Sequence, residues 1–173
     1  MKISCLSLCL LSTMCWLYST PTTGNKIFQF GPCMISMNVN EIRASFTVIK
    51  ATIQSKDERS DIRILHKSYS LQDTAPMNGC CFLRHLLRFY LATVFSHCKA
   101  SSPRASRRVS SIANSFLSIK KDLRLCHEVS MCHCGEDVKH KCGQILSQYE
   151  KMDVASAGLK ALGELDILLD WMD

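Results

Sequence analysis

The chain has 173 residues, of which 47% are hydrophobic and 21% are charged. Its 21 lysines and arginines against 15 aspartates and glutamates give a formal net charge of +6. This composition is typical of a chain that folds around a core, and it excludes disordered and collagen-like classes. The positive charge is moderate and spread along the sequence, unlike the basic arm of a nucleic-acid-binding protein, so we expect no nucleic acid as a partner.

The first 24 residues have the pattern of a secretory signal peptide. One positive charge, Lys2, precedes an apolar run over residues 3–18, and the small residues Thr22 and Gly24 occupy the positions that a signal peptidase reads. The run is short for a membrane span, and Pro21 follows it. We therefore expect cleavage near Gly24, a secreted product and one domain over residues 25–173. The net charge would fall from +6 to +5, because Lys2 is the only charged residue removed.

The first helix is expected over residues 37–54, where Asn38 and Glu41 have the spacing of a capping box at its start. Four apolar residues recur there with helical spacing and share one face: Ile42, Phe46, Ile49 and Ile53. The charged stretch 55–68 lacks such spacing until the segment "DIRIL", so we interpret it as a long, partly packed connection.

Four later segments repeat the helical pattern: residues 80–95, 109–126, 138–152 and 154–172. Leu146 belongs to the apolar stripe of the segment 138–152. Residues 99–108 are rich in helix breakers, so Arg104, Arg107 and Arg108 are interpreted as solvated loop residues. No window alternates with a period of two, and strands are not expected. Helices with one apolar stripe each predict an all-α bundle.

Eleven cysteines are present, and three of them, Cys5, Cys9 and Cys15, fall in the expected signal peptide. The other eight are Cys33, Cys80, Cys81, Cys98, Cys126, Cys132, Cys134 and Cys142. An even set in an oxidising compartment predicts disulfides. A zinc module stays open as an alternative, because "MCHCGEDVKHKC" offers Cys132, Cys134, His140 and Cys142 as ligand types.

Catalytic chemistry has no recognisable signature in the chain. The metalloprotease, hydrolase, dinucleotide and P-loop motifs are absent, and the six histidines are scattered. We therefore expect no enzyme activity, no catalytic residue, no cofactor and no bound metal.

Long blocks of sequence, in order along the chain, resemble the interleukin-10 cytokine family and, within it, the interleukin-20 subfamily. These blocks are "NEIRASF", "DIRIL", "SLQDTAP", "CCFLRHLLRFYL", "SSIANSFLSIKKDLRLC", "CHCGE" and "KALGELDILL". The resemblance implies a secreted, monomeric, compact bundle of six to seven helices that is stapled by disulfides. It also implies a ligand that bridges two class II cytokine receptor chains and signals through Janus kinases to STAT factors. The implied pair is the interleukin-20 receptor alpha and beta type chains, or an interleukin-22 receptor type chain with the beta chain.

The resemblance also implies how the cysteines pair: Cys33 with Cys126, Cys80 with Cys132, and Cys81 with Cys134. Cys98 and Cys142 are additional to the six cysteines of the subfamily, and each stands where the family pattern has an aromatic residue. Because these two restore an even count, we expect a fourth disulfide between them.

Two receptor-binding surfaces follow from the same resemblance. The first receptor chain would meet Asp61, Ile62, Arg63, Leu65, Lys160 and Glu164, with Ile64 as a further apolar anchor. Lys160 and Glu164 are four residues apart, so we expect both to project from one face of the last helix, away from Leu162 and Leu165. The shared receptor chain would meet Ile42, Arg43, Phe46, Ser111 and Asn114.

One alternative function remains from composition alone. A secreted cationic helical protein with amphipathic helices can bind polyanions, such as weakly held heparan sulfate, or membranes. Such binding should weaken steeply with added salt, whereas an apolar receptor interface should not.

Overall fold

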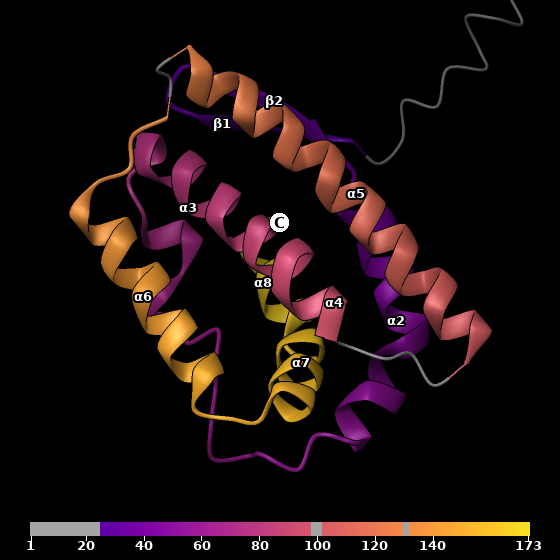
Figure 1. Ribbon diagram of the computed structural model, residues 1–173. Coiled ribbons are helices and arrows are strands. Elements are labelled where there is room, and N and C mark those ends of the chain that lie inside the picture. The colour runs from indigo at the N-terminus through magenta and orange to yellow at the C-terminus, as the bar shows by residue number, and fades with distance from the viewer. Residues whose placement is uncertain (1–24, 98–101, 130–131) are drawn as a thin grey trace, which may run out of the picture.

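The computed structural model describes residues 25–97, 102–129 and 132–173 (Figure 1). The expected signal peptide, residues 1–24, lies outside these ranges, and so does Cys98. The main helices are α2 (Val39–Ser55), α3 (Pro76–Phe89), α5 (Pro103–Glu128), α6 (Glu136–Glu150), α7 (Val154–Gly163) and α8 (Leu165–Trp171). The shorter elements are β1 (Lys26–Phe30), β2 (Cys33–Met37), the 3-10 turns η1 (Lys67–Tyr69) and η2 (Leu71–Asp73), and the pair η3 (Tyr90–Val94) and α4 (Phe95–His97).

The helices surround α3, which runs through the middle of the molecule. Figure 1 shows α5 along one side of α3 and α6 along the other, while α2 packs against α5 and α7 packs against α2. α3 continues through the π-helical turn η3 into α4, so residues 76–97 form one helical run. The fold-class prediction of a helical, disulfide-stapled bundle is confirmed.

Tyr90 lies at the centre of the core and is fully buried. Its hydroxyl donates a hydrogen bond of 2.7 Å to the carbonyl oxygen of Ala161, which satisfies the one polar atom of the side chain. Its ring meets that of Phe116 edge-on at 5.9 Å. The buried apolar side chains of α2, α3, α5, α7 and α8 join around these rings into one cluster.

An antiparallel hairpin of β1 and β2 precedes the helices, and the expectation of no strands is therefore wrong. Its turn places Gly31 at φ 61°, and a Cβ there would come within 2.8 Å of Met77 Cγ. In β2, alternate residues are buried against the core, ending with Met37. The alternation is obscured in the sequence because apolar Ile27 and Met34 occupy exposed positions of the hairpin.

α5 begins earlier than its apolar stripe suggested. The side chain of Ser102 caps it by accepting a hydrogen bond from the Ala105 amide at 3.2 Å, and Pro103 occupies its first turn. Arg104, Arg107 and Arg108 are therefore helical residues, and their assignment to a loop is wrong. At the start of α2 the expected cap is present, since Asn38 accepts from the Glu41 amide at 3.0 Å.

The C-terminal segment, expected as one helix, divides into α7 and α8 at Glu164. Leu162, Leu165, Leu168, Leu169 and Met172 are all buried, as their spacing indicated. Within the described ranges, no helix combines the length and the apolarity needed to cross a membrane.

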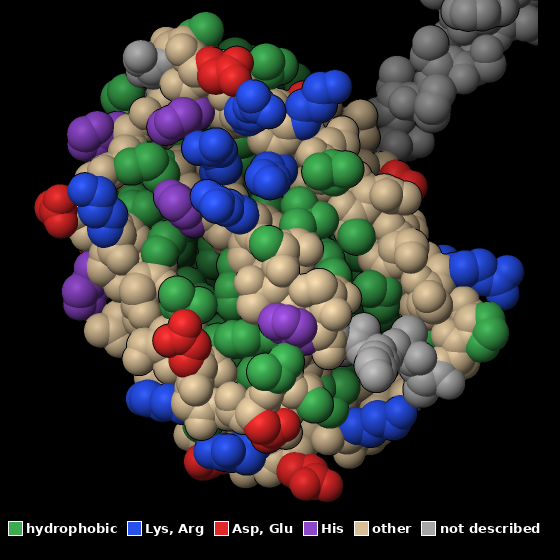
Figure 2. Space-filling model, viewed as in Figure 1, with side chains coloured by type: hydrophobic (Ala, Val, Ile, Leu, Met, Phe, Trp, Pro, Cys, Tyr) green, Lys and Arg blue, Asp and Glu red, His purple; other side chains and the backbone are tan. Residues whose placement is uncertain are grey.

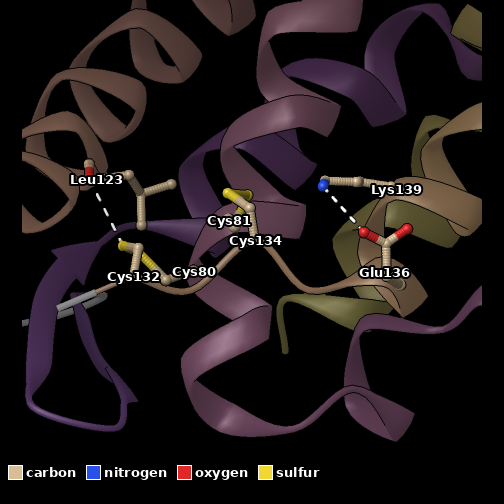
Figure 3. Close-up of a disulfide and its surroundings, with 7 residues drawn as sticks. All are labelled: Cys80, Cys81, Leu123, Cys132, Cys134, Glu136 and Lys139. Atoms are coloured by element: carbon tan, nitrogen blue, oxygen red, sulfur yellow. Dashed lines mark hydrogen bonds and ion pairs between the residues drawn. A yellow bond between two sulfur atoms is a disulfide. The ribbon is translucent and has the colours of Figure 1, made fainter. Parts of the chain in front are cut away.

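Three disulfides tie these elements together: Cys33–Cys126, Cys80–Cys132 and Cys81–Cys134. This is the pairing that the family resemblance implied. The first joins the start of β2 to the end of α5, with Cα atoms 5.7 Å apart. The other two fasten the segment before α6 to neighbouring positions of α3 (Figure 3). Among the described residues Cys142 has a free thiol, and its expected partner Cys98 lies outside the described ranges.

Removal of the Cys33–Cys126 bridge should lower the free energy of unfolding by about 4 kcal/mol, because a link over 93 residues strongly restricts the unfolded chain. Urea denaturation of the Cys33→Ser/Cys126→Ser variant measures this loss. Cys142→Ser is the matched control, since it removes a sulfur atom without breaking a bond. A loss in the double variant no larger than in this control would contradict the role given to the bridge.

Candidate functional site

The connection between α2 and η1 is held against the C-terminal helices by the carboxylate of Glu164. This side chain, only 6% exposed, accepts hydrogen bonds from the backbone amides of Ile64 at 2.9 Å and Leu65 at 3.1 Å. Ile64 and Leu65 are themselves fully buried, so their backbone amides cannot form hydrogen bonds with water instead. Glu164 therefore fixes the backbone of the connection at its apolar end.

Lys160, one helical turn before Glu164, fixes the other end of the same connection. Its ammonium group donates to Asp57 Oδ2 at 2.9 Å and to the carbonyl oxygen of Arg59 at 2.6 Å. The amide of Gln54 adds a hydrogen bond of 2.9 Å to the carbonyl oxygen of Gly163. Lys160 in α7 and Glu164, the residue between α7 and α8, thus both find their partners in the residues that follow α2.

Lys160 and Glu164 were expected to project away from Leu162 and Leu165 toward a receptor chain, but both are buried within the molecule. The connection after α2 packs over both side chains and leaves them 8% and 6% exposed. Leu65 and Ile64 point into the core and offer no apolar anchor to a partner. Burial raises the pKa of Glu164, although the hydrogen bonds from Leu65 and Ile64 and the charge of Lys160 oppose that rise.

The exposed part of the connection is the segment from Arg59 to Arg63. Arg59 and Asp61 form an ion pair at 3.1 Å, and the hydrogen bond from Arg59 lowers the pKa of Asp61. Ile62 is half-buried, and Arg63 is exposed with no ion pair to any described residue. A polar hollow of about 250 Å³ lies beside it, lined by Gln54, Asp57, Arg63, Lys160, Gly163, Glu164, Asp166 and Ile167. The structure thus brings the two expected segments together, with exposed charges on only one of them.

The second expected surface lies on α2 and α5, which pack against each other. Ile42 and Phe46 are buried in the core and do not face a partner. Arg43 is partly exposed and bonds to Asp170 at 3.0 Å, with Asp173 at 3.7 Å. On α5, Ser111 is half-buried and Asn114 is exposed.

Sequence reasoning missed the residues that hold the connection in place from the α2 side. Gln54 was only the last residue of the expected first helix, and Asp57 and Arg59 belonged to a charged stretch without periodicity. Their partners lie more than one hundred positions later, at 103 residues for Asp57 and Lys160, so no local spacing could have identified them.

The alternative of a zinc site at Cys132, Cys134, His140 and Cys142 is not supported, because two of these four ligands are in disulfides. Cys132 and Cys134 are bonded to Cys80 and Cys81, and a disulfide sulfur cannot act as a thiolate ligand. Cys142 retains its thiol, but it is half-buried, and burial raises its pKa to about 11. The sequence "MCHCGEDVKHKC" therefore serves as an anchor for α6.

Comparisons with known proteins agree over nearly the whole chain. The family model described as Interleukin 10 matches residues 4–173. Interleukin-20 of Mus musculus is 46% identical over 164 residues, which cover 95% of this chain and 93% of that protein. Interleukin-19 of Homo sapiens is 38% identical over 173 residues, covering 100% of this chain and 95% of that protein.

Two solved structures share the fold. The crystal structure of human interleukin-19 superimposes with a TM-score of 0.68 at 36% identity, covering 78% of this chain and 86% of that one. The structure of an edited human interleukin 24 gives a TM-score of 0.73 at 35% identity, covering 84% and 95%.

Replacement of Glu164 by alanine should lower the free energy of unfolding by about 2 kcal/mol, because two buried amides lose their acceptor. Hydrogen exchange at the Ile64 and Leu65 amides should accelerate with it. Asp166→Ala is the control, since it removes a nearby carboxylate whose ion pair with Lys50, at 3.0 Å, is partly exposed. We expect that loss to stay below about 1 kcal/mol. Unchanged exchange at both amides in Glu164→Ala would refute the fastening role.

Alkylation of Cys142 in the native protein at pH 8 should be about 100-fold slower than that of an ordinary cysteine. A pKa raised from 9.0 to about 11 reduces the reactive thiolate by that factor. Peptide mass spectrometry after iodoacetamide treatment, without reductant, gives the rate. A fast reaction would contradict the burial, and protection that persists in denaturant until a reductant is added would show that Cys142 is bonded to Cys98 after all.

Proposed function

The chain belongs to the interleukin-10 family of cytokines, and we propose that it is a secreted ligand that joins two class II cytokine receptor chains. Its relatives are interleukins, which are signalling proteins and not enzymes. In this proposal the joined receptor chains bring together their bound Janus kinases, which phosphorylate STAT factors. The receptor pair is either the interleukin-20 receptor alpha and beta type chains or an interleukin-22 receptor type chain with the beta chain. The observation that carries the proposal is the match to the family over residues 4–173.

The exposed connection of residues 59–63 is the surface that we assign to the first receptor chain. Asp61, Ile62 and Arg63 touch the receptor, while Leu65, Lys160 and Glu164 act as positioning residues behind them. Support comes from the hydrogen bonds that hold the backbone at Arg59, Ile64 and Leu65. A loop that is already ordered loses less conformational freedom when it binds, which favours affinity. Arg63 has no ion pair with any residue in the described ranges and is free for an acidic receptor group.

The shared receptor chain meets α2 and α5 through polar residues that are at least partly exposed. Arg43, Ser111 and Asn114 carry this contact, whereas Ile42 and Phe46 support it from the core. Arg43 is already oriented by Asp170, so its guanidinium group is presented in a fixed direction. Two surfaces on separate elements allow one molecule to hold two receptor chains.

The central test measures STAT phosphorylation and receptor affinity with the recombinant secreted chain. Cells that express both candidate receptor chains of one pair should respond, and cells that lack either chain should not. Arg63→Ala should weaken binding to the first chain by about 1–3 kcal/mol without changing the melting temperature. Arg88→Ala removes another exposed arginine that has no ion pair with a described residue, and it should change neither quantity.

Two further variants separate contact from positioning. Lys160→Ala should lower the melting temperature as well as the affinity, because it releases the connection. Arg43→Ala/Ser111→Ala/Asn114→Ala should weaken only the shared chain. No response from any candidate pair would contradict the proposed function, and wild-type affinity in Arg63→Ala would remove residues 59–63 from the interface.

A second candidate function is weak binding of a sulfated polysaccharide of the heparan sulfate type. Its support is the first turns of α5, where Arg104, Arg107 and Arg108 lie on helical spacing and form no ion pair with any residue that the structure describes. Retention on immobilised heparin should collapse with added salt and with substitution of these arginines. Receptor binding by Arg63 should not depend on them.

A further inference from the structure

A groove separates α6 from the helical run of α3 and η3. It has a volume of about 350 Å³ and is lined by His85, Leu86, Arg88, Phe89, Ala92, Thr93, Cys142, Ile145 and Leu146. Figure 2 shows a hollow with apolar side chains on this face, beside a cluster of basic side chains. This volume lies within the range of small-molecule sites, near its lower end.

The far wall of the groove is apolar and open. Leu146, which the helical pattern assigned to the core, is 45% exposed there, and Ile145 is buried next to it. Cys142 lies one turn earlier on the same face of α6. An exposed leucine beside a half-buried thiol leaves apolar surface in contact with water, and a ligand with a hydrocarbon portion would cover it.

The near wall contains an irregular backbone. Ala92 and Thr93 belong to the π-helical turn η3, which widens the helical run where it borders the groove. The carbonyl oxygens of both residues accept hydrogen bonds from Ser96 Oγ at 3.0 Å. The irregular turn therefore still has hydrogen-bond donors for these two carbonyl groups. Single π-helical turns occur frequently at functional sites because they shift the side chains around them.

The mouth of the groove is positively charged without compensation. Arg88 and His85 line it, and Arg84 precedes Arg88 by one turn on α3. Burial lowers the pKa of His85, and the neighbouring charges of Arg84, Arg88 and His127 lower it further. None of the four forms an ion pair within the described ranges, and Arg84 Nε is buried without a hydrogen-bond partner. Like charges one turn apart repel each other unless an anion lies between them.

We propose that this groove binds a small amphipathic anion, namely a medium-chain fatty carboxylate. Its hydrocarbon chain lies against Phe89, Ile145 and Leu146, and its carboxylate meets the guanidinium group of Arg88. A polysaccharide would leave the apolar walls uncovered, and an uncharged lipid would leave the basic mouth without a partner. This site is separate from residues 59–63 and does not depend on receptor binding.

The test is a titration of the isotope-labelled secreted chain with decanoate, below its micelle concentration, followed by backbone NMR. Shifts should concentrate at Ala92, Thr93, Ile145 and Leu146, with saturation below about 1 mM. Decanol supplies the same chain without charge and should bind about tenfold more weakly. Equal binding of the two probes, shifts spread over the basic surface, or no saturation by about 1 mM would each overturn the proposal.

Three variants make the result specific to the groove, with circular dichroism confirming that each is folded. Arg88→Glu should weaken decanoate about tenfold and leave decanol nearly unchanged. Ala92→Trp, at an exposed position of the wall, should remove binding of both probes. Arg107→Glu makes the same change of charge on α5 and should affect neither. Equal losses in Arg88→Glu and Arg107→Glu would show a general charge effect, and groove shifts that depend on protein concentration without decanoate would show that a second copy of the chain occupies the site.

Discussion

Two consecutive residues of α3, Cys80 and Cys81, impose the constraint on which the arrangement of the surrounding helices depends. Consecutive side chains of a helix point about 100° apart, yet both bond to one short segment before α6. That segment must therefore cross the helix closely, and the His133 amide donates to the Met77 carbonyl oxygen at 3.0 Å as it does so. The start of α6 is fixed beside α3 in this way (Figure 3), and the groove between the two helices is a consequence of that position.

Disulfide bonds fix the segment before α6 to α3, whereas buried charged side chains fix the connection that follows α2. Lys160 and Glu164 hold a connection that has few apolar residues of its own. Lys160 donates to a carboxylate and to a backbone carbonyl oxygen, and Glu164 accepts from two backbone amides. Removing one partner from such a set costs far more than an exposed ion pair would, because the remaining polar group is left in a dry environment. The exposed charges from Arg59 to Arg63 can therefore stand in a fixed array at the surface. In the proposed interface the recognition residues lie in the connection, while Lys160 and Glu164 support them from the C-terminal segment.

Sequence patterns predicted the helices because an apolar stripe records which face meets the core. Ile42, Phe46 and Leu165 show this directly, since all three are buried. The same pattern failed at Leu146, because a stripe cannot distinguish a packed face from the wall of a groove. It failed for β1 and β2, where apolar side chains occupy both faces of a short hairpin. The count of cysteines indicated disulfides, while their pairing came only from the family resemblance. The sequence identified the two segments that form the candidate site, residues 61–65 and 160–164. It did not indicate that Lys160 and Glu164 are buried, because their partners are about one hundred residues away in sequence.

Side chains link the first strand to residue 173. Lys26, the first residue of β1, forms an ion pair with Asp173, and Arg43 reaches the same carboxylate at 3.7 Å. Segments whose side chains meet in this way can be joined by a linker without unfolding either one, which makes the fold suited to circular permutation. The exposed turn at Lys151, between α6 and α7, offers a place for new ends. A permuted chain opened there would keep all three disulfides, because none of them involves the residues around Lys151.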